Sequence, residues 1–374
     1  MNKLFKTILI CIIVVVLVVV MAKTSILESI MKFVFGETKS VENTFDELWY
    51  FSKLTEREKD VYLRIANAIN NNDDSVVVVG KNNLSASDAS RAYEAYMLDN
   101  PECFYISSNY QMGVSKFLDV TKIKIKLTYS ENIKKLESKK MELEEKVGSI
   151  LSEVVSPEMT NYEKEVALHD YLIENVSYYN YENVDDIPLK KHSAYGALVE
   201  KEAVCDGISK AYSILLKKCG IQNVVVLGKM GNQHAWNKVK IDDSWYNVDV
   251  TSDACGKERI VSHVYFNLTD EVISKSHTID LTFQTPECSK SNDYYTCNAY
   301  EITNQDFLSD KISKIVSNTK GNVLEFRIES NAYDIQDVVQ KLYDMDFNKY
   351  KTNKIKEMSY YYIGNIFIIP KTNK

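Results

Sequence analysis

The chain opens with an uninterrupted apolar run from Ile8 to Ala22 that has lysines on both sides. If the run is extended back to Leu4, with one lysine side chain reaching up to the interface, residues 4–22 provide the roughly 17–25 residues that a membrane span needs. The pattern therefore predicts a membrane anchor over residues 1–23, with its positive flank in the cytosol and the body of the protein outside. A signal peptide cleaved after Ala22 is the alternative, and it would also export the body.

Residues 24–130 alternate between helical and strand-like spacing of their apolar positions, which predicts a small N-terminal α/β region. Helical spacing covers 54–71 and 88–98, and Ser87 is the expected N-cap of the second helix. Short apolar or alternating runs, which are typical of strands, cover 75–79, 103–106 and 123–129.

A charged helix with one apolar stripe is predicted over 131–155, at the start of a region that extends to residue 300. The stripe consists of Ile133, Leu136, Leu143, Val147, Ile150 and Val154. We expect this face to dock on a domain, because the repeat is short for an independent coiled-coil arm, which is the alternative. Thr160 and Glu163 then have the spacing of a capping box, which predicts a second helix up to Asn175.

The last part of the chain, residues 301–374, is predicted to form a separate β-α-β-β element. Its predicted parts are a strand over 323–328, a helix over 333–346, and a hairpin with arms over 358–363 and 365–369 and Gly364 at the turn. The sequence predicts no role for this element.

Composition narrows the class of protein. The 374 residues are 45% hydrophobic and 26% charged, which is typical of a globular protein and excludes a disordered chain. The formal net charge is −7, and the lysines near the N-terminus leave the body of the protein still more acidic. Because contacts to phosphates need clustered lysine and arginine, nucleic acid is not expected as a partner.

Seven cysteines raise the question of disulfide bonds and metal sites. Export would permit disulfides between the cysteines that follow Cys11, and Cys288 and Cys297, which flank a polar loop, are the pair that the sequence suggests. The sequence contains neither a Cys-x-x-Cys nor a His-x-x-x-His spacing. A structural zinc site is therefore not expected, and no other metal or cofactor is predicted.

The residues with candidate chemistry follow one another in a short part of the chain. Cys205 begins a predicted helix, and the unpaired N–H groups and dipole at a helix N-terminus favour a thiolate. His234 begins one predicted strand and Asp249 lies on the next, and adjacent antiparallel strands place such residues side by side. The imidazole would then take the thiol proton, while the carboxylate fixes the imidazole tautomer. Gly207 would keep the backbone beside Cys205 uncrowded, and the N–H of Cys205 would serve an oxyanion.

The motifs around these residues resemble the transglutaminase-like superfamily, in particular its bacterial members. They are Gly196-Ala-Leu-Val199, Ala203-Val-Cys205, His234-Ala-Trp-Asn237, Trp245-Tyr246, Val248-Asp-Val-Thr251, Tyr265-Phe266, Asp270-Glu271 and His277-Thr278. The resemblance covers residues 50–280 approximately. It implies an α+β, papain-like core in which a helix bearing Cys205 packs on an antiparallel sheet bearing His234 and Asp249. The implied roles are nucleophile for Cys205, acid and base for His234, and orienting group for Asp249.

Some positions depart from the family's pattern or have an uncertain role. Asp206 directly follows the implied nucleophile, and a carboxylate that faced the sulfur would oppose thiolate formation. Thr251-Ser-Asp stands where the family commonly has Thr-Trp-Asp. Tyr195, Gln233 and Trp236 are predicted to line the cleft or the oxyanion site, with packing as the alternative. The remaining histidines, His169, His192, His263 and His277, are predicted to be structural or to have no functional partner.

The resemblance implies a cysteine enzyme that forms an acyl-thioester on a protein or peptide amide, and the predicted anchor or signal peptide would place this enzyme at the cell surface. Water would complete hydrolysis, and a lysine amine would complete a crosslink. We expect hydrolysis, because a surface enzyme faces excess water and the sequence shows no acceptor site. The substrate would be a protein or peptide, with cell-wall peptide among the candidates. The alternative is a catalytically idle scaffold that binds peptide or cell-wall material.

Overall fold

The computed structural model describes residues 48–81, 84–118, 120–130, 132–255, 259–303, 307–319, 323–329, 333–344 and 361–370. Contacts divide the chain into two units, Met1–Ser52 and Lys53–Lys374. The described part of the first unit includes the short helix α3 (Trp49–Ser52). The predicted anchor over 1–23 lies outside the described residues, and no helix within them is long and apolar enough to cross a membrane. The predicted domain boundaries after 130 and 300 fall inside the second unit and stay predictions.

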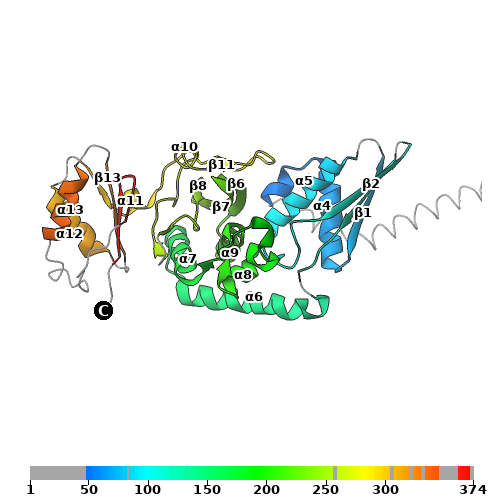
Figure 1. Ribbon diagram of the computed structural model, residues 1–374, viewed down its shortest axis with the longest axis horizontal. Coiled ribbons are helices and arrows are strands. Elements are labelled where there is room, and N and C mark those ends of the chain that lie inside the picture. The colour runs from blue at the N-terminus through cyan, green and yellow to red at the C-terminus, as the bar shows by residue number, and fades with distance from the viewer. Residues whose placement is uncertain are drawn as a thin grey trace, which may run out of the picture. The chain divides into compact units, whose positions relative to one another are not determined.

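The second unit begins with two helices and a three-stranded antiparallel sheet (Figure 1). The helices are α4 (Glu56–Asn70) and α5 (Ala86–Asp99), and the strands are β1 (Ser75–Lys81), β2 (Gln111–Phe117) and β3 (Val120–Lys126), in the order β1-β3-β2. Ile123 and Ile125 on β3 are buried, whereas the lysines between and beside them are exposed. The predicted helices over 54–71 and 88–98 and the strand over 75–79 are confirmed within one or two residues at most ends.

Two predictions for this region need correction, and one strand was missed. The N-cap of α5 is Ser85 rather than Ser87, because the Ser85 hydroxyl accepts the Asp88 N–H and the Asp88 carboxylate accepts the Ser85 N–H. The segment 103–106 forms turns, with an isolated bridge from Ile106 to Tyr129, and is not a strand. β2 was not predicted, because its mostly exposed residues lack the alternation that marks a half-buried strand.

A helix packed on an antiparallel sheet forms the centre of the second unit (Figure 1). The strands are β6 (Asn223–Met230), β7 (Asn232–Ile241), β8 (Ser244–Val248) and β11 (Thr278–Ile279), in the order β11-β6-β7-β8. The helix is α9 (Cys205–Lys218), whose residues Ala211, Leu215 and Leu216 are fully buried. This arrangement confirms the predicted α+β, papain-like class of fold.

Further helices and short strand pairs surround this core. They are α7 (Asn161–Asn175), α8 (Ala194–Leu198), α10 (Asp270–Ile273), α11 (Tyr294–Cys297), the 3-10 helices η1 (Val184–Asp186) and η2 (Leu189–His192), and the paired strands β4 (Ser177–Tyr178) with β5 (Glu202–Ala203) and β9 (Ala254–Cys255) with β10 (Ile260–Val261). The capping box predicted at the start of α7 is confirmed, because Thr160 and Glu163 bond reciprocally.

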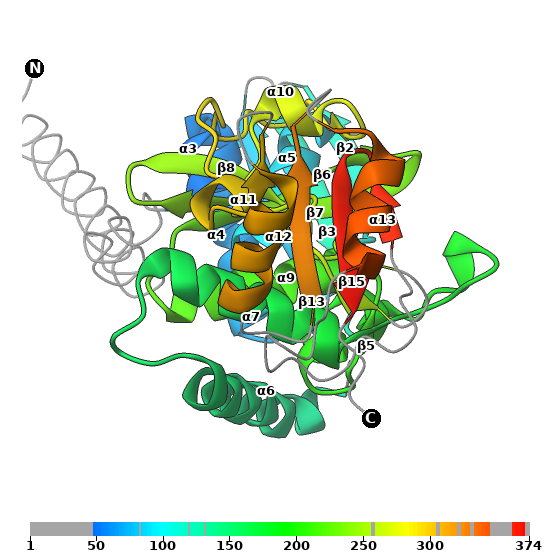
Figure 2. The same ribbon diagram turned by 90° about the vertical axis from the view of Figure 1, so that its left-hand side faces the viewer.

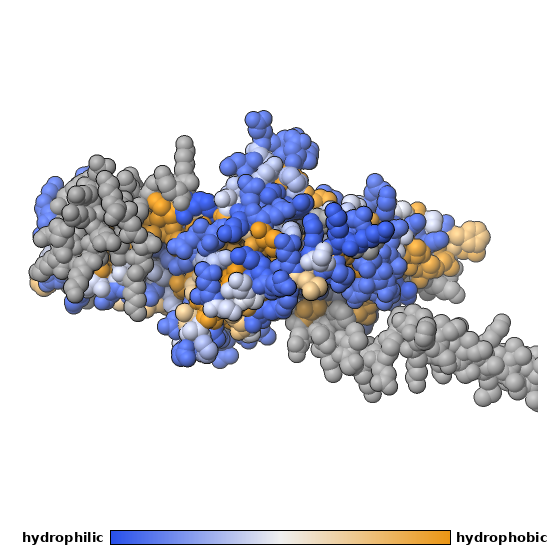
Figure 3. All heavy atoms as spheres, turned by 90° about the horizontal axis from the view of Figure 1, so that it is seen from below, coloured by the Kyte–Doolittle hydropathy of each residue, from blue (hydrophilic) through white to orange (hydrophobic). Residues whose placement is uncertain are grey.

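The long charged helix α6 (Ile133–Val154) docks its apolar face on the rest of the chain, as predicted. Leu136, Leu143, Val147 and Ile150 are all buried. The Tyr195 hydroxyl also donates to Glu142 of this helix, at 2.5 Å. On the face shown in Figure 3, hydrophilic side chains predominate and hydrophobic ones form small patches, so most of the apolar stripe of α6 contributes to the core.

The C-terminal element is a four-stranded sheet with two helices on one face (Figure 2). Its strands are β12 (Glu301–Ile302), β13 (Val323–Ile328), β14 (Tyr361–Ile363) and β15 (Ile366–Pro370), in the order β12-β13-β15-β14, and its helices are α12 (Leu308–Asn318) and α13 (Ile335–Asp344). The predicted strand over 323–328 is confirmed, as are the described parts of the predicted helix and hairpin, with Gly364 at a positive φ of 63° in the hairpin turn. Residues 345–346 and 358–360 of these predictions lie outside the described residues. β12 and α12 were not predicted. Ile366 and Ile368 cover the other face of the sheet and pack on Tyr295 of α11.

All six cysteines in the described part of the chain are free thiols, so the disulfide between Cys288 and Cys297 that the sequence suggests is not formed. Cys288 is buried, and its N–H donates to Asp270 at 2.9 Å. Cys297 is exposed on α11, with its sulfur 2.8 Å from the Asn292 side-chain oxygen. The two side chains on either side of the polar loop therefore lie in different surroundings, one buried and one exposed.

Candidate active site

Cys205 is the first residue of α9, so its side chain lies at the helix N-terminus, half-buried. The N-cap residue, Val204, provides no side-chain hydrogen bond, and the N–H groups of the first turn are therefore available to an oxyanion. The Val204 N–H itself donates to the Lys191 carbonyl at 2.9 Å. A Cβ at Gly207 would lie 2.5 Å from that same carbonyl oxygen. Gly207 thus allows the close packing that holds the start of α9 in place.

The sheet next to α9 carries the other two residues. The register of β6 and β7 pairs His234 with Gly228. The Ser209 hydroxyl donates to the Ala235 carbonyl at 3.0 Å, which joins α9 to β7 beside His234. Asp249 directly follows β8 rather than lying on a strand as predicted, and its N–H donates to the Tyr265 carbonyl at 3.1 Å. The β7–β8 hairpin therefore brings the imidazole and the carboxylate together.

The His234 imidazole lies between Asp249 and Cys205. Its Nε2 is 2.7 Å from Oδ2 of Asp249. Burial disfavours the charged imidazole, but hydrogen bonds and charge interactions with Asp249 and Cys205 outweigh it and raise the pKa of His234 to about 10. Because Nε2 is occupied by Asp249, Nδ1 is the nitrogen left for the thiol. At neutral pH the ring is therefore an imidazolium next to the sulfur.

Asp249 is fully buried and accepts five hydrogen bonds. Its Oδ1 accepts the backbone N–H groups of Thr251 at 3.0 Å and Ser252 at 3.1 Å. Its Oδ2 accepts His234, the Ser252 hydroxyl and Nε2 of His277, the last at 3.0 Å. Burial alone would raise the pKa of Asp249, but the hydrogen bonds from His234 and His277 hold it well below its usual range. The carboxylate is therefore ionised throughout the neutral range.

His277 is a site residue that sequence analysis missed. It is buried, and its Nδ1 lies 2.8 Å from the Ser276 hydroxyl while Nε2 faces Asp249. The residue precedes β11, which pairs with β6 across the sheet from His234. The motif His277-Thr278 is part of the family resemblance, but the residues around His277 do not predict a contact with Asp249. The contact depends on the pairing of the two-residue strand β11 with β6, which is distant in the sequence.

Asp206 does not leave a free carboxylate beside the nucleophile. Its Oδ1 lies 2.9 Å from Nδ1 of His192, and its Oδ2 lies 3.2 Å from Nζ of Lys210. Burial would raise the pKa of Asp206, but the Lys210 charge and the His192 contact lower it. Asp206 is therefore paired with two basic side chains. His192, predicted to have no functional partner, thus contacts the carboxylate of the residue next to Cys205.

The three predicted cleft residues occupy different places. Gln233 is exposed next to His234. Trp236 is fully buried behind His234, with ring centroids 6.2 Å apart, and its Nε1 donates to Asn247. Tyr195 is also buried and stacks on Phe104. Trp236 and Tyr195 thus have packing contacts, and of the three Gln233 is the one with an exposed side chain near the site.

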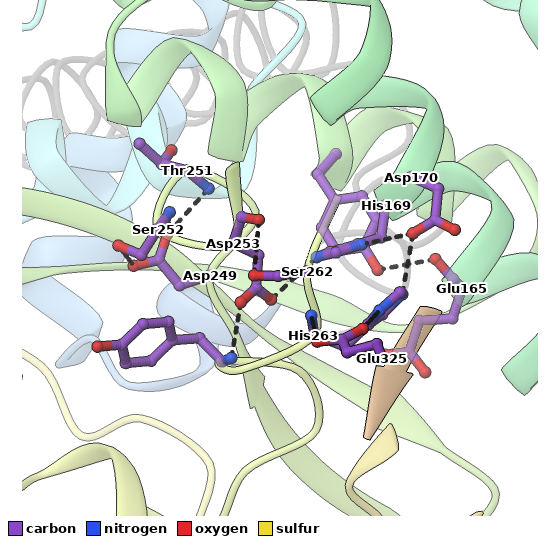
Figure 4. Close-up of polar contacts among 12 residues, drawn as sticks. Glu165, His169, Asp170, Asp249, Thr251, Ser252, Asp253, Ser262, His263 and Glu325 are labelled. Atoms are coloured by element: carbon purple, nitrogen blue, oxygen red, sulfur yellow. Dashed lines mark hydrogen bonds and ion pairs between the residues drawn. The ribbon is translucent and has the colours of Figure 1, made fainter. Parts of the chain in front are cut away.

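A second buried polar network lies beyond Asp249 (Figure 4). His169 lies between Asp170 at 2.9 Å and Asp253 at 3.1 Å, and His263 lies between Asp170 at 3.0 Å and Glu325 at 2.8 Å. Burial opposes a charged His263, but Asp170 and Glu325 raise its pKa to about 10. The network thus joins three parts of the chain: helix α7, the segment that follows β10, and strand β13 of the C-terminal element.

The second network reaches the site through one short segment. The Asp253 N–H donates to the Asp249 carbonyl at 3.1 Å, and the Asp253 carboxylate accepts the Tyr265 N–H at 2.7 Å. Because the Tyr265 carbonyl accepts the Asp249 N–H, these three residues form a closed set of hydrogen bonds. Asp253 therefore fixes the turn that presents the Asp249 carboxylate.

Among the residues that the structure describes, two groups of side chains have the spacing of metal ligands. They are His169, Asp170 and His263, and His234, Asp249 and His277, with ligand atoms within 4.8 Å of one another in each group. In both groups these ligand atoms already bond one another. The arrangement is therefore complete as a hydrogen-bonded network, and it requires no ion to balance it.

Comparisons with known proteins agree with the site. Residues 148–250 match the family model Transglut_core, described as the transglutaminase-like superfamily. The matched segment contains Cys205, His234 and Asp249. The chain therefore contains a transglutaminase-like domain. No curated protein sequence matches the chain.

Several solved structures are similar to parts of the chain. The crystal structure of a TGase shares 16% identity, with 51% of this chain and 54% of that chain covered and a TM-score of 0.28. A candidate cysteine protease from Cytophaga hutchinsonii shares 13% identity over 59% of this chain and 83% of that chain, with a TM-score of 0.26. A candidate protease from Parabacteroides distasonis shares 8% identity over 72% of this chain and 63% of that chain, with a TM-score of 0.29. This chain thus spans about half the length of the TGase.

Proposed function

We propose that the chain is a cysteine enzyme in which Cys205 attacks the carbonyl carbon of a protein or peptide amide. One observation carries the proposal: a cysteine at an uncapped helix N-terminus interacts with an imidazole that bonds a buried, ionised carboxylate. This is the relation of nucleophile, base and orienting group that acyl transfer through a thioester needs. The roles of Cys205, His234 and Asp249 follow from it.

The reaction proceeds in two steps. The Cys205 sulfur forms a bond to the carbonyl carbon, and the oxyanion accepts N–H groups at the start of α9. His234 gives its Nδ1 proton to the leaving nitrogen as the carbon–nitrogen bond breaks, which leaves a thioester and releases ammonia or an amine. Water then gives a proton to His234 as its oxygen bonds the thioester carbon. The carbon–sulfur bond breaks, which releases the acid product and restores the Cys205 thiolate beside the His234 imidazolium.

We propose hydrolysis as the main outcome, with crosslinking to an amine as its competitor. Both outcomes share the same thioester, and water is in large excess at any open site. The substrate would be a protein or peptide, including cell-wall peptide, if the apolar segment over 4–22 anchors or exports the body as its sequence predicts. Cell-surface location and substrate class are both parts of this proposal.

Alkylation of Cys205 by iodoacetamide tests the proposal without knowledge of the substrate. Cys297 is an internal reference thiol, because it is exposed and desolvation and Asp293 raise its pKa. The imidazolium of His234 favours a thiolate at Cys205, so at pH 6.5 we expect Cys205 to react about 10-fold faster than Cys297 or more. Mass spectrometry assigns the label to each site. In His234→Ala the faster alkylation of Cys205 should disappear. Equal alkylation rates for Cys205 and Cys297 in the protein without substitutions would contradict the proposal.

A further inference from the structure

Oδ2 of Asp249 accepts three side-chain donors, although an orienting carboxylate needs to serve one imidazole. The donors are His234 at 2.7 Å, His277 at 3.0 Å and the hydroxyl of Ser252. Oδ1 already accepts two backbone N–H groups, so it is not available to accept the side-chain donors in place of Oδ2. The three donors therefore share the accepting capacity of one oxygen.

The protonation of His277 follows from its partners. Asp249 is ionised and can only accept, so Nε2 of His277 must carry a proton. Nδ1 faces the Ser276 hydroxyl at 2.8 Å, and Tyr265 and Trp236 pack on the ring at centroid distances of 5.4 and 5.0 Å. These contacts hold the ring with its Nε2 facing Asp249.

We propose that His277 and Ser252 are positioning residues: by bonding Asp249, they limit how far this carboxylate increases the proton affinity of His234. Each donor that Oδ2 accepts lowers the negative charge available to the others. Asp249 would otherwise face His234 with an undivided charge, and an imidazolium that holds its proton too firmly is slow to give that proton to the leaving nitrogen. Two extra donors thus keep His234 useful as the acid of the first step. This inference rests on the proposed function of the site.

The test measures the proton affinity of His234 directly. The chain has five histidines, so their ring signals can be followed by NMR in protein labelled on histidine, with His234→Gln to assign the signal. The full chain is used in a Cys205→Ala background, which removes the thiol from the charge balance and removes turnover. In this background His234 faces the carboxylate of Asp249, and the groups that face this carboxylate in turn are His277, Ser252 and Tyr265.

In this background Ser252→Ala and His277→Phe should each raise the titration midpoint of His234. Loss of a hydrogen bond of about 1 kcal/mol corresponds to about 0.7 pH units. His277→Gln should leave the midpoint nearly unchanged, because the amide retains a donor. Midpoints that stay constant or fall in Ser252→Ala and His277→Phe, with thermal stability alone reduced, would show a packing role and overturn the inference.

The outcome is independent of the proposed reaction. If His277→Phe fails to fold, Ser252→Ala still decides the matter, because it removes one donor with little change in volume. If the alkylation test fails but the midpoints rise, the charge sharing stands and the enzyme proposal falls. If alkylation succeeds and the midpoints do not rise, the enzyme proposal stands and the inference falls.

Discussion

Replacing Cys205 with alanine is expected to reduce turnover of a protein or peptide amide by a factor of about 10³ or more. The loss should be this large because the thioester can form on no other atom: the reaction would have to proceed by direct attack of water. The measurement is ammonia or peptide release, and incorporation of a labelled amine, over a panel of unfolded proteins and cell-wall peptides. Trapping of the acyl-enzyme on intact protein, reversed by hydroxylamine, gives a second signal that should be absent from the variant.

Cys219→Ala is the matched control for Cys205→Ala. Cys219 lies at the other end of α9 and is also a half-buried free thiol, so the control changes the same atoms on the same helix. Its activity should equal that of the unmodified protein. Turnover that persists in Cys205→Ala would exclude the nucleophile assignment. Retained binding of a peptide without turnover in either protein would favour the idle scaffold instead.

The short-range part of the site was predictable from sequence because it depends on neighbouring elements. Cys205 was expected to start a helix and does so, and the predicted hairpin does bring His234 to Asp249. Asp249 was predicted to lie on a strand, but β8 ends at the preceding residue, Val248. The chain turns after Asp249, and its carboxylate accepts the N–H groups of Thr251 and Ser252 in that turn.

The long-range part of the site was not predictable in the same way. His277 reaches Asp249 because β11 pairs with β6, and a two-residue strand leaves no periodic pattern to detect. His192 reaches Asp206 from the end of η2, a 3-10 helix that the sequence did not indicate. In both cases the sequence indicated no partner for the histidine, and its partner is a carboxylate contributed by another part of the chain.

Glu325 shows why burial was the hardest property to predict. Leu324 and Phe326 pack under the helices of the C-terminal element, so by alternation Glu325 points to the opposite face of β13. A lone strand with that pattern indicates a solvent-exposed carboxylate. Instead the second face of the sheet packs on the core, and Glu325 is 3% exposed. The predicted separate element is thus joined to the core by a buried charge.

Glu325→Ala is therefore expected to destabilise the protein by about 3–5 kcal/mol at neutral pH. Its carboxylate accepts the backbone N–H of His263 at 2.9 Å, the ring Nδ1 at 2.8 Å and the hydroxyl of Tyr295. Alanine leaves three buried donors without this acceptor and leaves His263 with Asp170 as its remaining carboxylate. Denaturant unfolding measures the change. Glu325→Gln keeps the shape and one acceptor oxygen and should lose clearly less.

The loss in Glu325→Ala should also depend on pH with a definite sign. The pKa of His263 is raised to about 10 in the folded protein, above the usual 6.5, so its ion pairs contribute fully below pH 6.5 and are lost as pH rises through 10. The stability difference between Glu325→Ala and the unmodified protein should therefore be largest near pH 6 and shrink towards pH 10. A difference that is constant with pH would mean that His263 is neutral when folded. The network around Asp170 would then be held by hydrogen bonds alone, and the C-terminal element would dock on the core without a buried charge.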